Sequence, residues 1–144
     1  MKANSDYPTM NAKAPQGVSA GGVPYKVLIV DDSMFIRKQI SQILTSEGFE
    51  VVGNAEDGEE GYEMYKSLHP GVDVVTMDIT MPRMDGVSSL EKIIEFDSNA
   101  KVIMISALGK GDLVKKSLMS GAKNYIVKPL DRKIVLERIL SAIG

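Results

Sequence analysis

Residues 72–86 read VDVVTMDITMPRMDG, and the end of this stretch decides how the chain folds. An apolar run from Val72 to Met77 stops at Asp78, and an Asp85-Gly86 pair follows a few residues later. Burying an ionised carboxylate without a partner is costly. Asp78 is therefore either an ordinary loop residue just past a strand, or a residue whose charge is balanced by groups nearby.

Short apolar runs of the same kind recur along the chain and alternate with helical patterns. The expected strands are residues 26–30, 49–53, 73–78, 102–106 and 124–127. The helical patterns that follow them cover residues 35–44, 57–68, 87–94, 112–120 and 131–140, and Asp57 and Asp131 are the expected caps of the second and the last. Five such βα units predict a doubly wound α/β fold, in which helices cover both faces of a parallel sheet and the connections are right-handed.

In sheets of this kind the functional residues lie at the carboxyl ends of the strands, near the switch in strand order. The polar residues at those ends are Asp31, Asp32, Asp78, Ser106 and Lys128. We expect them to meet at one edge of the sheet. Each has an ordinary alternative: an aspartate can cap a helix, a serine commonly ends a strand, and a lysine usually lies in solvent.

Three carboxylates in one pocket repel one another, so a cation is needed to keep them all ionised. A hard divalent cation with oxygen ligands meets this need. The chain has no cysteine, and its one histidine, His69, precedes Pro70 in an expected loop, so Mg²⁺ is favoured over zinc. With Lys128 as a second cation, such a pocket allows a carboxylate to accept a phosphoryl group, because phosphoryl transfer depends mainly on positioning and electrostatics. Asp78 is the expected acceptor.

The length and charge of the chain limit the other classes of function. Its 144 residues are enough for one domain, and a formal net charge of -2 gives no sign of a nucleic-acid partner. No apolar run reaches the roughly 18 residues of a membrane span, and the first 24 residues lack the apolar stretch of a secretion signal. A cytoplasmic location is therefore expected. Residues 1–24, rich in proline and glycine, predict a flexible tail before a domain at 25–144.

Four segments, VLIVDDS, VVTMDITMPRMDG, VIMISA and NYIVKPL, occur in this order within residues 25–144. Together they resemble the receiver domains of two-component response regulators, and in particular the single-domain receivers of chemotaxis. The resemblance implies the flavodoxin-like receiver fold with strand order 2-1-3-4-5. It also implies a cis bond between Lys128 and Pro129.

The resemblance assigns a role to each polar residue of the expected edge. Asp78 is implied as the phosphoacceptor and Lys128 as the phosphate-binding lysine. Ser106 and Tyr125 are implied as a switch pair, in which the serine hydroxyl turns toward the phosphoryl group and the tyrosine ring changes rotamer with it. The implied Mg²⁺ ligands are Asp31, Asp32, Asp78 and the Thr80 backbone carbonyl.

A switch of this kind needs partners that read its state. The resemblance implies a CheA-like histidine kinase as phosphodonor, a flagellar motor switch protein as target, and a phosphatase. It also implies a monomer that is not an enzyme, apart from catalysing its own phosphoryl transfer and autodephosphorylation. The expected partner contacts are Lys110, Val114, Leu118, Tyr125 and Val127. The alternative for Val114 and Leu118 is that they only pack the core.

Three other functions share part of this pattern. Phosphatases of the haloacid dehalogenase type usually carry a second acid two residues after the nucleophile, where this chain has Thr80. A nucleotide-binding protein would need a GxxxxGK[ST] or GxGxxG motif, and the sequence has neither. A phosphorelay intermediate, or the receiver of another two-component pathway, shares every site residue. Only the identity of its partners separates it from a chemotaxis switch.

Overall fold

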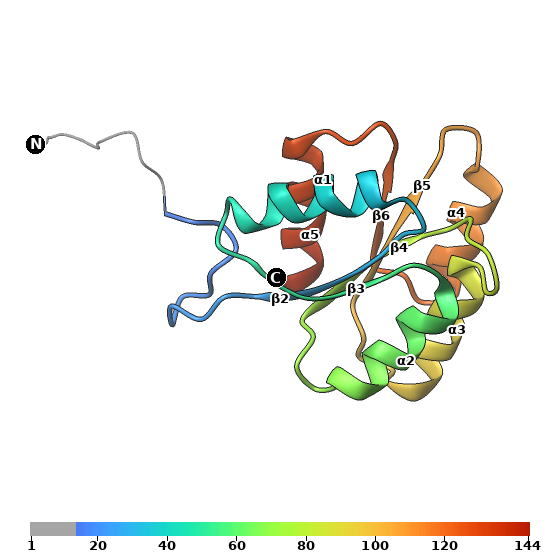
Figure 1. The fold of residues 1–144 in the computed structure, drawn as a ribbon, viewed down its shortest axis with the longest axis horizontal. Helices are drawn as coiled ribbons and strands as arrows, with labels where there is room; N and C mark the ends of the chain where they lie inside the picture. The colour runs from blue at the N-terminus through green and yellow to red at the C-terminus, as the bar shows by residue number, and fades with distance from the viewer. Residues whose placement is uncertain (1–13) are drawn as a thin grey trace, which may run out of the picture.

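Five short apolar segments form a parallel sheet, and a helix follows each strand (Figure 1). The computed structural model describes residues 14–144. The strands are β2 (Lys26–Val30), β3 (Glu50–Ala55), β4 (Val74–Asp78), β5 (Val102–Ser106) and β6 (Asn124–Val127). The helices are α1 (Met34–Thr45), α2 (Gly58–Leu68), α3 (Gly86–Phe96), α4 (Gly111–Met119) and α5 (Arg132–Ile143).

The strands lie in the order β3-β2-β4-β5-β6, which is the expected order 2-1-3-4-5, and every pair is parallel. The flavodoxin-like fold is therefore confirmed. All five residues of β4 and of β5 are buried, as expected for strands covered on both faces. The register pairs Val30 with Met77 and Asp78 with Ile105, so the carboxyl ends of the central strands reach the same edge.

Helices cover the two faces of the sheet unequally: α1 and α5 lie on one face, and α2, α3 and α4 lie on the other (Figure 1). Ile40 of α1 and Ile139 of α5 are fully buried in one apolar cluster. Leu90 and Ile93 of α3 are fully buried in the other. Phe35 departs from the helical stripe expected over residues 35–44, because it is 73% exposed at the start of α1.

Four of the five helices begin on a side chain that accepts a hydrogen bond from a backbone N–H in the first turn, which satisfies part of the helix end. The caps are Ser33, Asp57, Asp85 and Asp131. The capping expected for Asp57 and Asp131 is thus confirmed. All four caps lie in loops that follow strands, so they also fix the loops that surround the functional edge.

Residues 14–24, here called the N-terminal strap, pack against the turn between α1 and β3. The Gly17 N–H donates to the Glu47 carbonyl at 2.7 Å, and Val18 and Pro24 form an antiparallel bridge. A methyl group on Gly17 would overlap the Phe49 ring, so the glycine permits a close approach here. The strap thus contacts the domain expected at residues 25–144. The flexible tail expected over residues 1–24 stays a prediction, and residues 1–13 of that tail lie outside the described part of the chain.

The Glu47 side chain joins the strap to α5. One carboxylate oxygen accepts from the Gln16 N–H at 3.0 Å, and the other accepts from Arg132 Nη2 at 2.7 Å. Arg132 Nη1 also donates to Ser46 Oγ at 2.7 Å. The start of the described chain and its last helix are thus held by the same turn.

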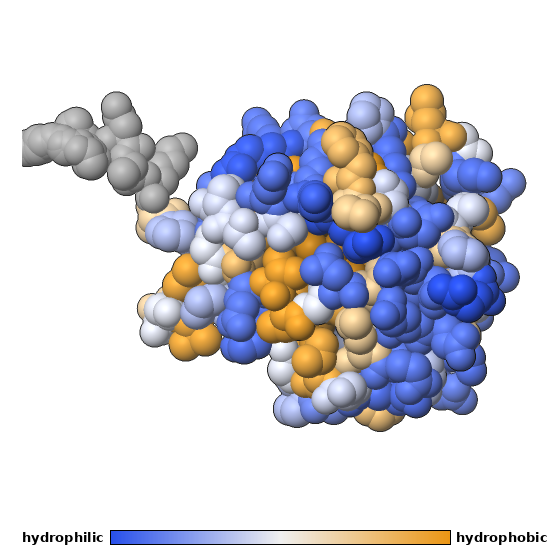
Figure 2. Space-filling model, in the orientation of Figure 1, coloured by the Kyte–Doolittle hydropathy of each residue, from blue (hydrophilic) through white to orange (hydrophobic). Residues whose placement is uncertain are grey.

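The surface seen in Figure 2 is mainly hydrophilic over α2, and hydrophobic side chains gather between α1 and α2, over the edge strand β3. Within residues 14–144, no helix combines the length and the apolar character needed to cross a membrane.

Candidate functional site at the carboxyl edge of the sheet

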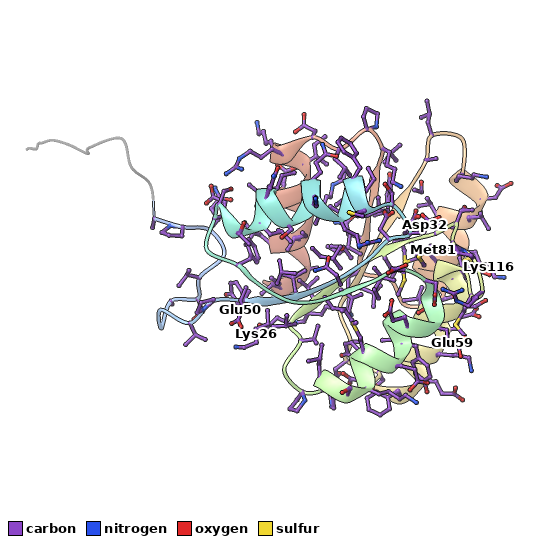
Figure 3. The ribbon with its side chains drawn as sticks, in the orientation of Figure 1. Lys26, Asp32, Glu50, Glu59, Met81 and Lys116 are labelled. Carbon is purple, nitrogen blue, oxygen red and sulfur yellow. The ribbon has the colours of Figure 1, made fainter. Side chains whose placement is uncertain are left out.

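Three carboxylates meet where β2 and β4 end. Asp31, directly after β2, is fully buried, and Asp32 is exposed. Asp78, the last residue of β4, is 5% exposed. One carboxylate oxygen from each of the three residues lies within 4.8 Å of the others. In Figure 3, Asp32 lies at the end of the sheet away from Lys26, as the direction of β2 requires.

Lys128 reaches the same pocket from the end of β6. Its backbone N–H donates to the Ser106 carbonyl at 2.8 Å, which extends the β5–β6 pairing to the edge. Its Nζ lies 3.5 Å from Asp31 Oδ2 and 3.5 Å from Asp78 Oδ1. The expected cis bond to Pro129 is present. The pocket therefore contains the lysine and the three acids that the sequence predicted would meet.

The pocket has more negative charge than Lys128 can balance. Burial, together with repulsion from Asp31, raises the pKa of Asp78 to about 6, and Lys128 only partly opposes this rise. Burial also raises the pKa of Asp31. Within residues 14–144, Asp31 Oδ2 is buried without a hydrogen-bond partner. This buried oxygen accepts no hydrogen bond from the described residues and has only the 3.5 Å ion pair with Lys128. Together with the two other carboxylates it forms a ligand set that suits a hard divalent cation such as Mg²⁺.

The loop after Asp78 turns tightly at the end of β4. The Ile79 N–H donates to the Ile105 carbonyl at 3.0 Å, and the Gly86 N–H donates to the Ile79 carbonyl at 2.7 Å. A methyl group on Gly86 would overlap the Asp78 carbonyl oxygen. Thr80 lies exposed in this loop. Gly86 of the opening stretch is thus required by its close packing against the end of β4, which sequence reasoning did not identify.

Ser106 and Tyr125 lie on neighbouring strands beside this pocket. Ser106 is 2% exposed, and its hydroxyl donates to the Ala107 carbonyl at 3.1 Å. Tyr125 is half-buried, with the Arg138 guanidinium carbon 5.2 Å from its ring centroid. Arg138 also donates to the Tyr125 carbonyl at 2.7 Å. Sequence reasoning missed Arg138, because no motif connects a strand residue to a helix residue thirteen positions later.

The five expected partner contacts and Ser106 line one groove of about 410 Å³ between the β5–α4 loop, α4 and β6. Leu118 and Val127 are 40% and 38% exposed, whereas Val114 is only 8% exposed. Val114 packs in an apolar cluster as well as lining the groove, and its role as a partner contact stays a prediction, whereas Leu118 offers an exposed apolar surface. Among the helices of residues 14–144, α4 alone lacks a side-chain cap, since Lys110 at its N-cap position makes no capping hydrogen bond.

A further ion pair borders the loop after Asp78. Arg83 Nε and Nη2 lie 2.8 and 2.6 Å from Asp57 Oδ2. The sequence predicted Asp57 only as a helix cap, and it gave no sign of Arg83, since the two residues are 26 positions apart.

Comparison with known proteins agrees with this geometry. Residues 27–140 match the family model of the response regulator receiver domain, and the chain belongs to that family. The chemotaxis protein CheY of Treponema pallidum is 65% identical over 143 residues, which is 99% of each chain. CheY of Bacillus subtilis is 48% identical over 115 residues, or 80% of this chain and 94% of its own.

Among solved structures, the fold matches the crystal structure of the CheX-CheY-BeF3-Mg+2 complex from Borrelia burgdorferi with a TM-score of 0.88. The sequences are 56% identical, and the match covers 92% of this chain and 99% of that one. The resemblance seen in the sequence is therefore confirmed, and the protein is a receiver domain similar to the CheY chemotaxis regulators.

Proposed function

We propose that this protein is a phosphorylation-dependent signalling switch in which Asp78 accepts a phosphoryl group from a histidine kinase. One observation carries the proposal: a buried strand ends on Asp78, beside two further carboxylates within 4.8 Å and a lysine 3.5 Å away. A carboxylate oxygen of Asp78 attacks the phosphorus of a phosphohistidine. The new O–P bond forms as the P–N bond breaks, and the leaving imidazole takes a proton from solvent.

Mg²⁺ is the proposed cofactor, held by Asp31, Asp32, Asp78 and the Thr80 backbone carbonyl. When bound, it neutralises charge on the carboxylates and on the phosphoryl oxygens. Lys128 already lies between Asp31 and Asp78, so its ammonium group can bind a phosphoryl oxygen without a large movement. The same geometry supports autodephosphorylation. In that step water attacks the phosphorus, the bond to Asp78 breaks, and inorganic phosphate leaves.

The output of the switch is proposed to pass through Ser106 and Tyr125. If the Ser106 hydroxyl turns toward a phosphoryl oxygen, it gives up its bond to the Ala107 carbonyl and vacates space that the Tyr125 ring can enter. Both residues line the groove beside α4, so this movement changes the shape of the groove. A partner responds only if its affinity differs between the two shapes.

The proposed partners follow the chemotaxis resemblance. A CheA-like kinase supplies the phosphoryl group, and a flagellar motor switch protein binds the groove through Lys110, Leu118, Tyr125 and Val127. The Borrelia relative was solved in complex with CheX. A CheX-like protein is the proposed phosphatase partner of this chain.

Mass spectrometry of the intact protein, after incubation with a small-molecule phosphodonor, tests the proposal. We expect one phosphoryl group that requires Mg²⁺, is removed by hydroxylamine as an acyl phosphate, and is absent from Asp78→Asn. An acid-stable adduct, or equal labelling of Asp78→Asn, would contradict it. Binding of a motor switch peptide that does not tighten on phosphorylation would contradict the proposed output.

A further inference from the structure

The loop between β4 and α3, residues 79–85, is held in place by a side chain from another part of the chain. Arg83 Nε and Nη2 both contact Asp57 Oδ2, at 2.8 and 2.6 Å. The Asp57 side chain is only 4% exposed, whereas the Arg83 side chain is 65% exposed. A buried carboxylate with one charged partner differs from the usual surface ion pair, in which both groups remain in solvent.

The backbone at Arg83 is strained. Its φ is +62°, in the left-handed region that a residue with a β-carbon seldom adopts. Such strain persists only where the surrounding structure enforces it. The contact with Asp57 is one such constraint, and Arg83 lies three residues after Thr80 and three before Gly86.

Asp57 is itself fixed. Its other carboxylate oxygen accepts from the Glu60 N–H at 2.9 Å and so begins α2. The next residue continues the attachment, because the Gly58 N–H donates to the Met84 carbonyl at 2.9 Å. A methyl group on Gly58 would overlap that carbonyl. Two consecutive residues of the loop are therefore bound to two consecutive residues at the start of α2.

We propose that the Asp57–Arg83 pair positions the 79–85 loop for cation binding, so that the Thr80 carbonyl is pre-organised beside the three carboxylates. This inference rests on the proposed function, since that function gives Thr80 its role at the metal site. Arg83 is a positioning residue, because it acts through the loop and touches no metal ligand. The competing explanation is an ion pair that stabilises the surface and has no effect on the site.

Substitution of either partner by asparagine tests the inference. Arg83→Asn removes the guanidinium but suits a positive φ, so any effect reflects the lost contact and not added strain. Asp57→Asn keeps an oxygen to cap α2 and removes the charge that Arg83 contacts. Arg132→Gln is the matched control, because it breaks the Arg132–Glu47 pair, whose arginine is 49% exposed, away from the 79–85 loop.

Two measurements separate positioning from simple stabilisation. Amide hydrogen exchange in the metal-free protein reports the order of the loop, and Gly86, whose N–H donates to the Ile79 carbonyl, is one reporter. Calorimetric titration with Mg²⁺ alone measures the affinity of the site for the cation. We expect faster exchange at the loop and about tenfold weaker Mg²⁺ binding in both asparagine variants, as for other residues that support a metal ligand. Arg83→Lys should recover part of the affinity, and the double variant should be no weaker than either single variant.

Wild-type exchange and Mg²⁺ affinity in Arg83→Asn would overturn the inference, and so would equal losses in the Arg132→Gln control. Faster exchange with unchanged Mg²⁺ affinity would show that the pair orders the loop without affecting the metal site, and this result would also overturn the inference. If the wild-type protein binds no Mg²⁺, the proposed function fails together with the metal role of the pair. The exchange measurement still shows in that case whether the pair orders the loop.

Discussion

The Lys128 ammonium lies 3.5 Å from Asp78 Oδ1, and it lies at the same distance from Asp31 Oδ2. One cation is thus shared between two buried carboxylates, with the third carboxylate of Asp32 at the exposed side of the pocket. Burial is the main cause of the raised pKa of Asp78, and the negative charge that one shared cation leaves in the site adds to it, so Lys128 lowers this pKa only in part. The site therefore favours any further positive charge that can enter it.

Asp78→Asn should stabilise the metal-free protein at neutral pH. The pKa of Asp78 rises from 3.8 to about 6 on folding, so the folded state binds the proton more tightly than the unfolded state. Its contribution to stability is complete below pH 3.8 and is lost as the pH rises through 6. Asparagine carries no such penalty, so we expect a gain on the order of 2 kcal/mol at pH 7.5 and little difference near pH 3.5. Urea unfolding at both pH values measures this, and a variant less stable than wild type at pH 7.5 would refute it.

Phosphoryl uptake should depend on pH through the same group. Only the ionised carboxylate of Asp78 is a nucleophile, so at low Mg²⁺ the rate should rise with pH and reach half its maximum near 6. Saturating Mg²⁺ stabilises the ionised form and should move this midpoint to lower pH. Initial rates with a small phosphodonor at two Mg²⁺ concentrations check the prediction. A midpoint that does not respond to Mg²⁺ would exclude the cation from the pocket.

Lys128→Met should slow phosphoryl uptake about 100-fold, as expected when a preorganised group that stabilises transition-state charge is removed. It should also leave Asp31 and Asp78 without their shared cation, so the pH midpoint for uptake should rise. Lys133→Met, on the exposed first turn of α5, is the matched control and should label at the wild-type rate. Equal rates for the two variants would show that Lys128 has no role in the transfer.

Leu118→Lys and Val114→Lys should behave differently, although both change the groove. Leu118 is 40% exposed, so its variant should fold, accept the phosphoryl group and lose binding of the motor switch segment. Val114 is 8% exposed, and burying an unpaired ammonium there should lower the free energy of unfolding by about 3 kcal/mol or more. Thermal unfolding and peptide titration separate the two effects. A Leu118→Lys protein that still binds the segment would place the output surface elsewhere.

Gly17→Ala should destabilise the protein by about 1–3 kcal/mol, because the added methyl group overlaps the Phe49 ring. Gly21→Ala is a suitable control: its added β-carbon meets only Ser19 Oγ, at 3.9 Å. Chemical unfolding of the two variants measures the contribution of the strap. Equal stabilities would show that the strap packs too loosely to contribute to the fold.

Sequence patterns were sufficient to predict where the strands and helices lie and which polar residues reach the sheet edge, because apolar periodicity and strand direction are local properties. Asp31, Asp78 and Lys128 met as expected, since parallel strands bring their carboxyl ends together. The order of the strands required the resemblance to a known family. Local patterns alone do not specify which strands become neighbours.

The features that were missed depend on contacts between distant parts of the chain. Gly17 belongs to a segment whose composition indicates flexibility, and only its closeness to Phe49 shows why glycine is there. Phe35 has the periodicity of a buried residue but is exposed at the start of α1. Arg83 has an ordinary neighbourhood in the sequence, and its role depends on a carboxylate 26 residues away.

The two apolar clusters are completed at different stages of synthesis on the ribosome. Val27 near the start of the domain and Ile139 near its end belong to the same cluster. Ile103 and Ile105 of β5 share this cluster with α1 and α5, so when β5 has been made, α1 can already cover its part of this face but the part that α5 packs on is still uncovered. Chains interrupted before residues 132–143 are made would present this apolar surface to other molecules, which makes them prone to aggregation. Helix α5 is therefore the element that removes this apolar surface from solvent as the domain is completed.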